Sequence, residues 1–295
     1  MTTLIYGNCA VRSYFIFILI LVLLQSTAVY SQTVTIQGNS RNDYFVDVLK
    51  NALSYSPDKG YNLAFYQKDI PKTRVFDNIA NNNGIDIVAG GATTAREQIL
   101  QPIWFPILKG LFGWRIPLIN KDNPDLFFGG LSTKAFFKLT VGQLHSWSDV
   151  KILESNGVTV VKGSHFEGLF QMLSAKRFDY FPRSILEVQK EFDDRKALNI
   201  AVDKYALIHY PSAYVFYVNK ENHKLAKDVT YGLEQSLKDG SFERLFKRYF
   251  GDIIKKTRNE KRTIYQLQNP FLPEKTPLKR KELWLNFSTE KEVIL

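Results

Sequence analysis

Apolar and polar positions between residues 33 and 91 follow two periods in turn. Short apolar runs rich in β-branched and aromatic residues predict strands, and they alternate with stretches in which apolar residues recur every three or four positions, which predict helices. The predicted elements are strands at 33–36, 61–66 and 85–89 and helices at 44–55 and 71–82. Asn42 or Asp43 can cap the first helix, because a short polar side chain accepts hydrogen bonds from the free N–H groups at a helix start. The order strand, helix, strand, helix, strand predicts a parallel sheet with right-handed crossovers.

The same order recurs between residues 140 and 202. The predicted elements are strands at 140–145, 158–161, 178–181 and 198–202 and helices at 147–155, after 163–164 and at 182–192. Two apolar segments, 113–119 and 214–218, are predicted to cross between the two sets. The sequence therefore predicts an α/β fold of the two-lobed kind, in which each lobe is a mostly parallel sheet flanked by helices and two crossing strands join the lobes. A cleft between such lobes is a favoured ligand site, and extended crossings form a natural hinge.

The C-terminal part of the chain starts with two amphipathic helices and then loses its periodicity. These helices are predicted at 223–238 and 241–250. Beyond them, Pro270, Pro273 and Pro277 predict an extended strap, anchored by Trp284 and Leu285. The predicted boundaries are a signal peptide at 1–31, a discontinuous first lobe at 32–115 and 213–251, a second lobe at 116–212, and an extended basic strap at 252–295.

The first 31 residues have the features of a secretory signal peptide. Arg12 is their only charge, an apolar run of eleven residues spans 14–24, and Val29 and Ser31 stand at positions −3 and −1 of a cleavage site before Gln32. The run is too short to cross a bilayer comfortably, although an uncleaved anchor is the alternative. We therefore expect a protein exported to the periplasm.

The cysteine content and the net charge limit the kinds of site and partner that this protein can have. Cys9 is the only cysteine and precedes the apolar run, so we expect no lipoprotein and, after cleavage, no disulfide, cysteine-based metal site or thiol nucleophile. The net charge of +10 falls to +9 without Arg12, and much of the excess lies in 255–281. Because an exported protein rarely meets nucleic acid, this basic segment is interpreted as solvated or membrane-facing. The four histidines have no metal-ligand spacing, so neither a metal nor a cofactor is expected.

The segment 84–97 joins a predicted strand to a turn of small residues and an arginine. The backbone of Gly91 can approach a ligand closely, and the hydroxyls of Thr93 and Thr94 can donate hydrogen bonds. Arg96 offers a planar fork that fits a carboxylate. Ligands bind beyond the carboxyl ends of parallel strands, so this turn is a candidate anion site. A surface turn with a structural arginine is the alternative.

Several motifs, in their order and spacing, resemble the periplasmic solute-binding proteins of the polar amino-acid type, solute-binding family 3, which have the type II periplasmic-binding fold. The motifs are the strand 85–89 followed by Thr93-Thr94-Ala95-Arg96-Glu97, then Trp104-Phe105-Pro106, and the segments 160–164, 176–181 and 237–250. The resemblance covers most of 34–251, and segment 141–187 further resembles a subgroup with unassigned ligands. It implies a monomeric binding protein that closes on a small polar or anionic, carboxylate-bearing and amino-acid-like solute. Such a protein serves an ABC transporter or a sensor.

The resemblance also implies roles for particular residues. Arg96 would pair with the ligand carboxylate, assisted by the backbone of Gly91 and the hydroxyl of Thr93. The helix that starts at Ser164, with His165 beside it, would present free N–H groups and a positive dipole end to the same anionic group.

Four further residues are candidates for the cleft. Amino-acid binders of this family have an acidic residue shortly after the strand of the second lobe, whereas this chain has Arg183, which favours a more anionic ligand. Pairing with Glu187 one turn later is the alternative for Arg183. Tyr180, Trp104 and Tyr44 are candidate cleft walls, with packing in the core as the alternative.

Two other functions compete with solute binding. Lyases or dehydratases of this fold act on small carboxylates with a positioned general acid, for which His165, Glu167 and Asp179 are the candidates. The chain has no Ser-His-Asp order, so we expect no enzyme. In the third interpretation the cleft is vestigial and the basic tail serves a structural or signalling role.

Overall fold

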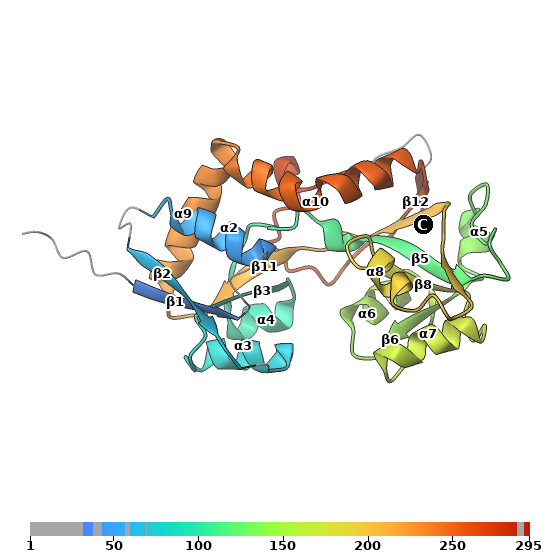
Figure 1. Cartoon of the computed structure of the whole chain (residues 1–295), viewed down its shortest axis with the longest axis horizontal. Coiled ribbons are helices and arrows are strands. Elements are labelled where there is room, and N and C mark those ends of the chain that lie inside the picture. Colours follow the sequence, from blue (N-terminus) through green and yellow to red (C-terminus); the bar gives the residue numbers. More distant parts are fainter. Residues whose placement is uncertain (1–31, 38–42, 57–59, 69, 288–291) are drawn as a thin grey trace, which may run out of the picture.

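The computed structural model has two lobes (Figure 1) and describes residues 32–37, 43–56, 60–68, 70–287 and 292–295. The predicted signal peptide, its cleavage site and Asn42 lie outside these residues. Within the described part of the chain, every helix is too short or too polar to span a bilayer.

The first lobe is built on a five-stranded sheet. Its strands are β1 (Gln32–Gln37), β2 (Tyr61–Tyr66), β3 (Ile87–Gly91), β4 (Gln101–Ile103) and β11 (Tyr214–Val218). Its helices are α2 (Tyr44–Leu53), α3 (Lys72–Ala80), α4 (Thr94–Ile99) and α9 (His223–Lys238). The strand order is β2-β1-β3-β11-β4, with β1, β2 and β3 parallel and β11 antiparallel to β3 and β4. Asp43 caps α2 as predicted, because its carboxylate accepts the backbone N–H of Phe45 at 2.9 Å.

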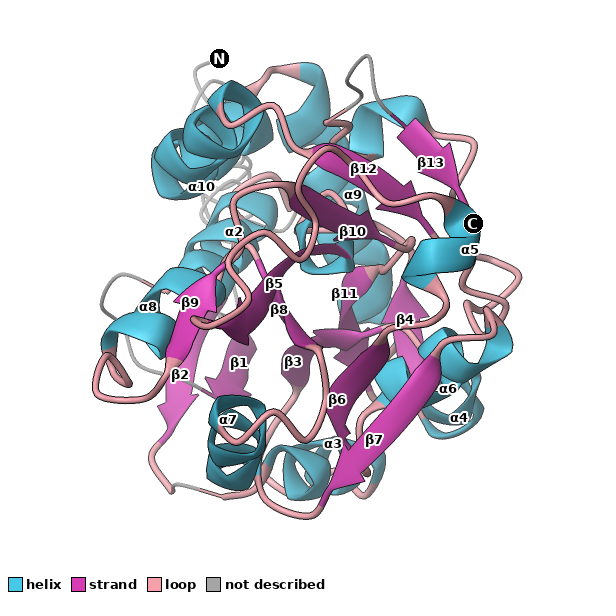
Figure 2. Cartoon of the chain, turned by 90° about the vertical axis from the view of Figure 1, so that its right-hand side faces the viewer, coloured by secondary structure: helices cyan, strands magenta, loops and turns pink. Residues whose placement is uncertain are grey.

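The second lobe is built on an eight-stranded sheet. Its strands are β5 (Trp114–Asn120), β6 (Thr140–Leu144), β7 (Thr159–Gly163), β8 (Tyr180–Ser184), β9 (Ile200–Val202), β10 (Ala206–His209), β12 (Thr263–Gln266) and β13 (Glu292–Ile294). Its helices are α5 (Thr133–Phe136), α6 (Ser148–Ser155), α7 (Phe166–Ser174) and α8 (Val188–Asp193). The order is β13-β12-β10-β5-β8-β6-β7, with β9 paired to β5, and Figure 2 shows this sheet from the side of the second lobe. The predicted two-lobed α/β fold is thus confirmed.

The two strand crossings between the lobes touch each other. The first leads from β4 through a 3-10 turn, η1 (Leu111–Gly113), into β5, and the second joins β10 to β11. The N–H of Tyr210 donates to the carbonyl of Gly113 at 3.2 Å. A Cβ atom on Gly113 would lie 2.1 Å from the carbonyl oxygen of Tyr210, so only glycine permits this approach.

The segment around Pro182 differs from its prediction. A helix was expected over 182–192, but β8 continues to Ser184 and α8 covers only Val188–Asp193. Residues 180–184 pair antiparallel with β5, with Pro182 opposite Pro117. The prediction was wrong because the pairing partner lies far away in the sequence, and a local pattern does not contain it.

The expected extended strap at 252–295 is also wrong in part. Residues 252–259 continue helix α10 (Ser241–Asn259), and β12 and β13 add two strands to the second sheet. Burial of Ile264 and Tyr265 against the second lobe explains why this segment becomes a strand. Residues 267–287 then return to the first lobe, where Trp284 packs against Gly110 and the N–H of Leu285 donates to Lys109 at 2.8 Å. α10 runs along the side of both lobes, as Figure 1 shows.

Candidate functional site

Arg96 lies at the carboxyl end of β3, where the sequence analysis placed an anion-binding turn. It belongs to the first turn of α4, and its Nη1 donates to the carbonyl oxygen of Gly91 at 2.5 Å. Its guanidinium also lies 4.4 Å from the centre of the Phe76 ring. No carboxylate of the described residues pairs with it, and the side chain is half-buried. The guanidinium of Arg96 is therefore fixed by two contacts and keeps further N–H groups that can donate to a ligand, as an anion-binding arginine requires.

The small residues around Arg96 hold this turn in place. Thr93 caps α4, because its hydroxyl accepts the N–H of Arg96 at 3.2 Å. The hydroxyl of Tyr217 donates to the carbonyl of Gly91 at 3.1 Å, and burial raises the pKa of Tyr217 to about 12, so it remains a donor near neutral pH. Thr94 is exposed. Trp104 is half-buried and packs against the apolar cluster beneath this turn.

The start of α7 supplies the candidate anion site of the second lobe. Ser164 and His165 are both exposed there. His165, and not Ser164, is the residue before the helix, and its side chain makes no capping hydrogen bond. The first N–H groups of α7 therefore have no side-chain cap, which leaves them available to an external acceptor.

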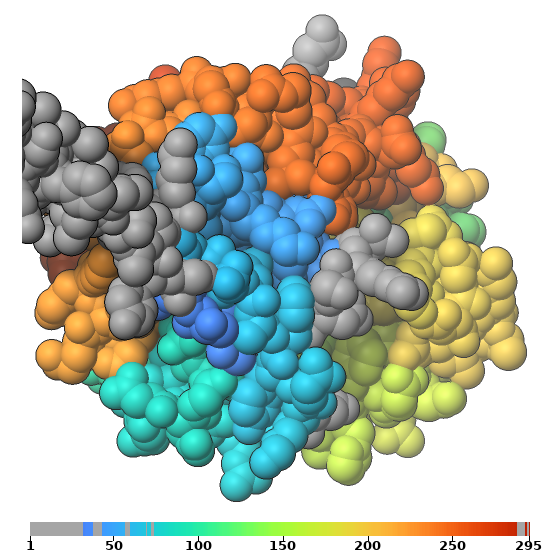
Figure 3. All heavy atoms as spheres, turned by 60° about the vertical axis from the view of Figure 1, so that its left-hand side comes forward, coloured from blue at the N-terminus to red at the C-terminus, as the bar shows by residue number. Residues whose placement is uncertain are grey.

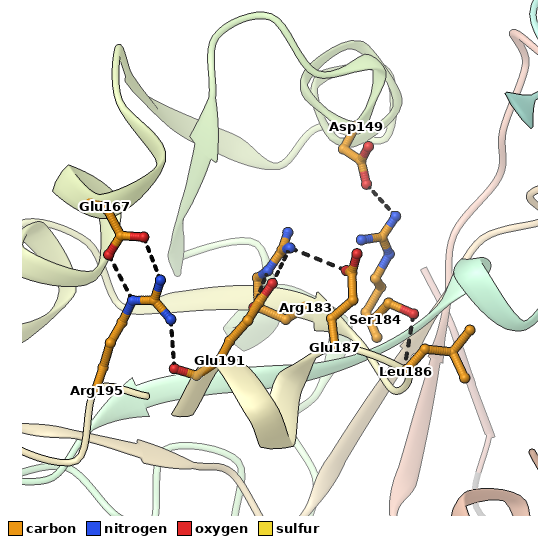
Figure 4. A network of polar contacts seen from close by, with 9 residues as sticks. Asp149, Glu167, Arg183, Ser184, Leu186, Glu187, Glu191 and Arg195 are labelled. Carbon is orange, nitrogen blue, oxygen red and sulfur yellow. Dashed lines mark hydrogen bonds and ion pairs between the residues drawn. The ribbon is translucent and has the colours of Figure 1, made fainter. Parts of the chain in front are cut away.

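Arg183 lies in a buried network of charges (Figure 4). Its Nε and Nη2 donate to the two carboxylate oxygens of Glu191, both at 2.6 Å, and Nη2 also contacts Glu187 at 3.1 Å. The guanidinium lies 4.6 Å from the centre of the Trp147 ring, and only 5% of the side chain is exposed. The structure thus has the alternative arrangement, an intramolecular ion pair, in place of an arginine that is free to bind an anion.

A second arginine extends this network toward the strand crossing. Arg115 Nη2 pairs with Asp149 at 2.7 Å, and the hydroxyl of Tyr210 donates to the same carboxylate. Burial raises the pKa of Glu187, while Arg183 and Arg115 act in the opposite direction. Two guanidinium groups and three carboxylates share this face, which leaves one net negative charge when all are ionised. Among these carboxylates Glu187 is the most exposed, with 35% of its side chain accessible.

The site has two halves, the turn that carries Arg96 in the first lobe and the charged network of Arg183 and Arg115 in the second. Both half-sites adjoin the second strand crossing. Gly91 pairs with Tyr214 in the first sheet, and Tyr210 holds Asp149 in the second lobe. Four residue steps separate Tyr210 from Tyr214, which spans at most roughly 14 Å. The topology therefore places the turn of Arg96 and the charged network on the two sides of one short crossing.

Two predicted cleft residues belong to the core. Tyr44 is 5% exposed, and its hydroxyl donates to the carbonyl of Ile107 at 2.5 Å. Tyr180 is fully buried between Phe127 and Phe136. Their assignment as cleft walls is corrected, because each ring completes an aromatic cluster inside its own lobe.

The acids considered for a lyase have structural partners. Asp179 accepts the N–H and the hydroxyl of Thr140, at 2.7 and 2.8 Å. Glu167 pairs with Arg195. Within the described residues, no group of three His, Cys, Asp or Glu side chains could hold a metal ion.

Glu191, Arg115 and Asp149 were not predicted from the sequence as residues of the site. Glu191 stands eight positions after Arg183. A helix was predicted over 182–184, where the structure has a strand, so the contact between the two side chains was not foreseen. An arginine at the start of a crossing strand was the signal that could have pointed to Arg115.

No family model matches this chain, and no curated protein matches it in sequence. Solved structures do share its fold. The probable amino-acid ABC transporter extracellular-binding protein YtmK from Bacillus subtilis is 18% identical, with a TM-score of 0.56, over 75% of this chain and 98% of that one. An ancestral arginine-binding protein bound to arginine is 17% identical, with a TM-score of 0.51, over 75% of this chain and all (100%) of that one. The likeness shows that this chain has the two-lobed fold of periplasmic binding proteins.

Proposed function

We propose that this chain is an exported solute-binding protein of the polar amino-acid type. It closes its two lobes on a small amino-acid-like solute that bears a carboxylate. The observation that carries the proposal is that two half-sites of opposite charge, one in each lobe, lie beside the same crossing. Arg96 is a cation without a carboxylate partner among the described residues, and the network around Glu187 has one net negative charge.

These two half-sites complement a zwitterion. A ligand carboxylate would accept from Arg96 and from the uncapped start of α7, and a ligand ammonium group would face Glu187. This revises the expectation of a more anionic ligand, because two carboxylates neutralise Arg183. The solved relatives support the proposal, since one is bound to arginine and another is described as an amino-acid ABC transporter protein.

Closure would follow from contacts that exist only when the lobes approach. A ligand that binds both half-sites favours the closed state by the difference between its affinities for the two states. Gly113 and Tyr210, where the two crossings touch, are the natural pivot. In this proposal the protein is a monomer in the periplasm, and it delivers its solute to an ABC transporter or reports it to a sensor.

Thermal unfolding with a panel of free amino acids, dicarboxylates and amines tests the proposal. We expect amino acids to raise the melting temperature. We expect Arg96→Ala to abolish this rise while leaving the ligand-free melting temperature nearly unchanged. Arg74→Ala is the matched control, because Arg74 is an exposed arginine on α3 of the same lobe. An Arg96→Ala protein with the full ligand shift would remove Arg96 from the site. Incubation of the binding solute with the protein, followed by product analysis, tests the lyase alternative.

A further inference from the structure

The outer face of α10 carries a stripe of cations. Its exposed basic side chains are Arg244, Lys247, Arg248, Lys255, Lys256 and Arg258. Spacings of three and four residues place most of them along one side of the helix. Figure 3 shows α10 (orange) at the surface of the molecule, running along its upper edge in that view. This face is therefore open to a partner.

A pocket of about 360 Å³ opens beside the middle of this helix. Lys247, Lys255 and Arg258 supply its cations. Half-buried Leu285 lines it, together with Phe246 and Ile254, which are almost completely buried. The pocket thus combines a basic rim with an apolar floor.

Gly251 lines the same pocket and has no packing reason to be glycine. A Cβ atom placed on it would meet nothing within 4 Å, whereas a Cβ atom on Gly232 of α9 would lie 1.8 Å from the carbonyl oxygen of Ala52. Glycine inside a helix destabilises the helix relative to alanine. Gly232 is explained by close contact between helices, and Gly251 instead leaves open space between Lys247 and Lys255.

The charges around the pocket are incompletely balanced. Glu243 is the one carboxylate among its lining residues, and it already contacts Lys109 at 2.7 Å and Lys247 at 3.7 Å. Among the described residues, no carboxylate lies within ion-pair distance of Lys255 or Arg258. Arg258 Nη2 also donates to the carbonyl oxygen of Asn286 at 3.5 Å, and its other N–H groups and the Lys255 ammonium group can bind an anion that enters from outside.

We propose that this pocket binds the phosphate of an anionic phospholipid, with the first part of an acyl chain against Leu285 and the edges of Phe246 and Ile254. Lys255 and Arg258 would donate to the phosphate oxygens, as lysine and arginine do in phosphate sites. A free phosphate or an acidic peptide would leave the apolar floor unused. A helix with a basic outer face can lie along a negatively charged membrane surface. This site is separate from the proposed solute site, and neither depends on the other.

Calorimetric titration of the full-length protein with short-chain lipids tests the proposal. The probe is monomeric dihexanoylphosphatidylglycerol, and the neutral comparison is dihexanoylphosphatidylcholine. We expect the anionic lipid to bind about tenfold more tightly or better, since each basic residue near an anionic lipid contributes roughly a fivefold factor and the pocket has two such residues. The proposal is overturned if the two lipids bind equally. It is also overturned if glycerol 3-phosphate or a short polyglutamate peptide binds as tightly as the anionic lipid, because the site would then recognise a free anion or an acidic protein.

Two variants assign the binding to the pocket. Lys255→Glu with Arg258→Glu should remove the preference for the anionic lipid. Lys134→Glu with Lys138→Glu, an equal charge change at exposed positions of the second lobe, should retain it. If the pocket double variant fails to fold, Gly251→Leu decides, because it fills the pocket and keeps both cations. Undiminished lipid binding by Gly251→Leu would then overturn the proposal.

Discussion

Replacing Glu191 by glutamine should destabilise the second lobe more than its position near the end of a short helix suggests. Glu191 holds the 5% exposed side chain of Arg183 with two hydrogen bonds at 2.6 Å. Loss of one member of a buried pair costs about 3–5 kcal/mol when the remaining charge has no other partner. Glu187 still contacts Arg183 at 3.1 Å, and glutamine retains one acceptor oxygen, so we expect a loss of about 2 kcal/mol.

The second carboxylate of the network makes this prediction sharper. Glu187→Gln alone should cost about 0.5–1 kcal/mol, because this side chain is 35% exposed and contacts Arg183 at one oxygen. The two substitutions together should exceed the sum of the single effects by about 1–2 kcal/mol. The double variant leaves Arg183 buried with no carboxylate, and residues that share one partner couple.

Urea denaturation followed by circular dichroism at pH 7 measures these losses as changes in the free energy of unfolding. Asp194→Asn is the matched control, because Lys190 of α8 and Asp194, the residue after this helix, form a pair at 2.7 Å with 81% and 51% of their side chains exposed. We expect that variant to change stability by less than about 0.5 kcal/mol. An effect of Glu191→Gln no larger than that of Asp194→Asn, or a double variant equal to the sum of its parts, would refute the reasoning.

Three further predictions concern helix packing and pH. Gly251→Ala should stabilise the protein by about 1 kcal/mol, because the new Cβ atom meets nothing within 4 Å and alanine favours a helix; a rise in the urea midpoint checks this. Gly232→Ala should destabilise it by several kcal/mol, on the order of an overpacked core, because its Cβ atom would lie 1.8 Å from the carbonyl oxygen of Ala52; stability equal to wild type would contradict this contact. Burial lowers the pKa of His209 to about 4, so below the ordinary value of 6.5 the unfolded chain binds a proton that the folded chain does not. The stability that neutral His209 contributes is therefore complete above about pH 6.5 and falls by up to about 3 kcal/mol as the pH drops toward 4. In the His209→Gln variant, the free energy of unfolding should change less between pH 5 and 7 than it does in the wild type.

The sequence by itself determined most local elements and the division into two sets. β2 at Tyr61–Tyr66 and α9 at His223–Lys238 have the predicted bounds, because the period of their apolar side chains is a property of neighbouring residues. The repeated order of strands and helices was also sufficient to predict the two-lobed α/β fold. It placed Arg96 at the carboxyl end of β3, where the structure has it, although its role as ligand anchor stays a prediction.

Only the tertiary structure decided which polar groups are already in use. The sequence left Arg183 two roles, a ligand contact or a partner of Glu187, and the fold places it between Glu187 and Glu191. Strand β12 likewise exists because β10 lies beside it, more than fifty positions earlier in the chain. Burial, ion pairing and strand pairing depend on residues that are distant along the chain, so a local pattern predicts an element but not its partner.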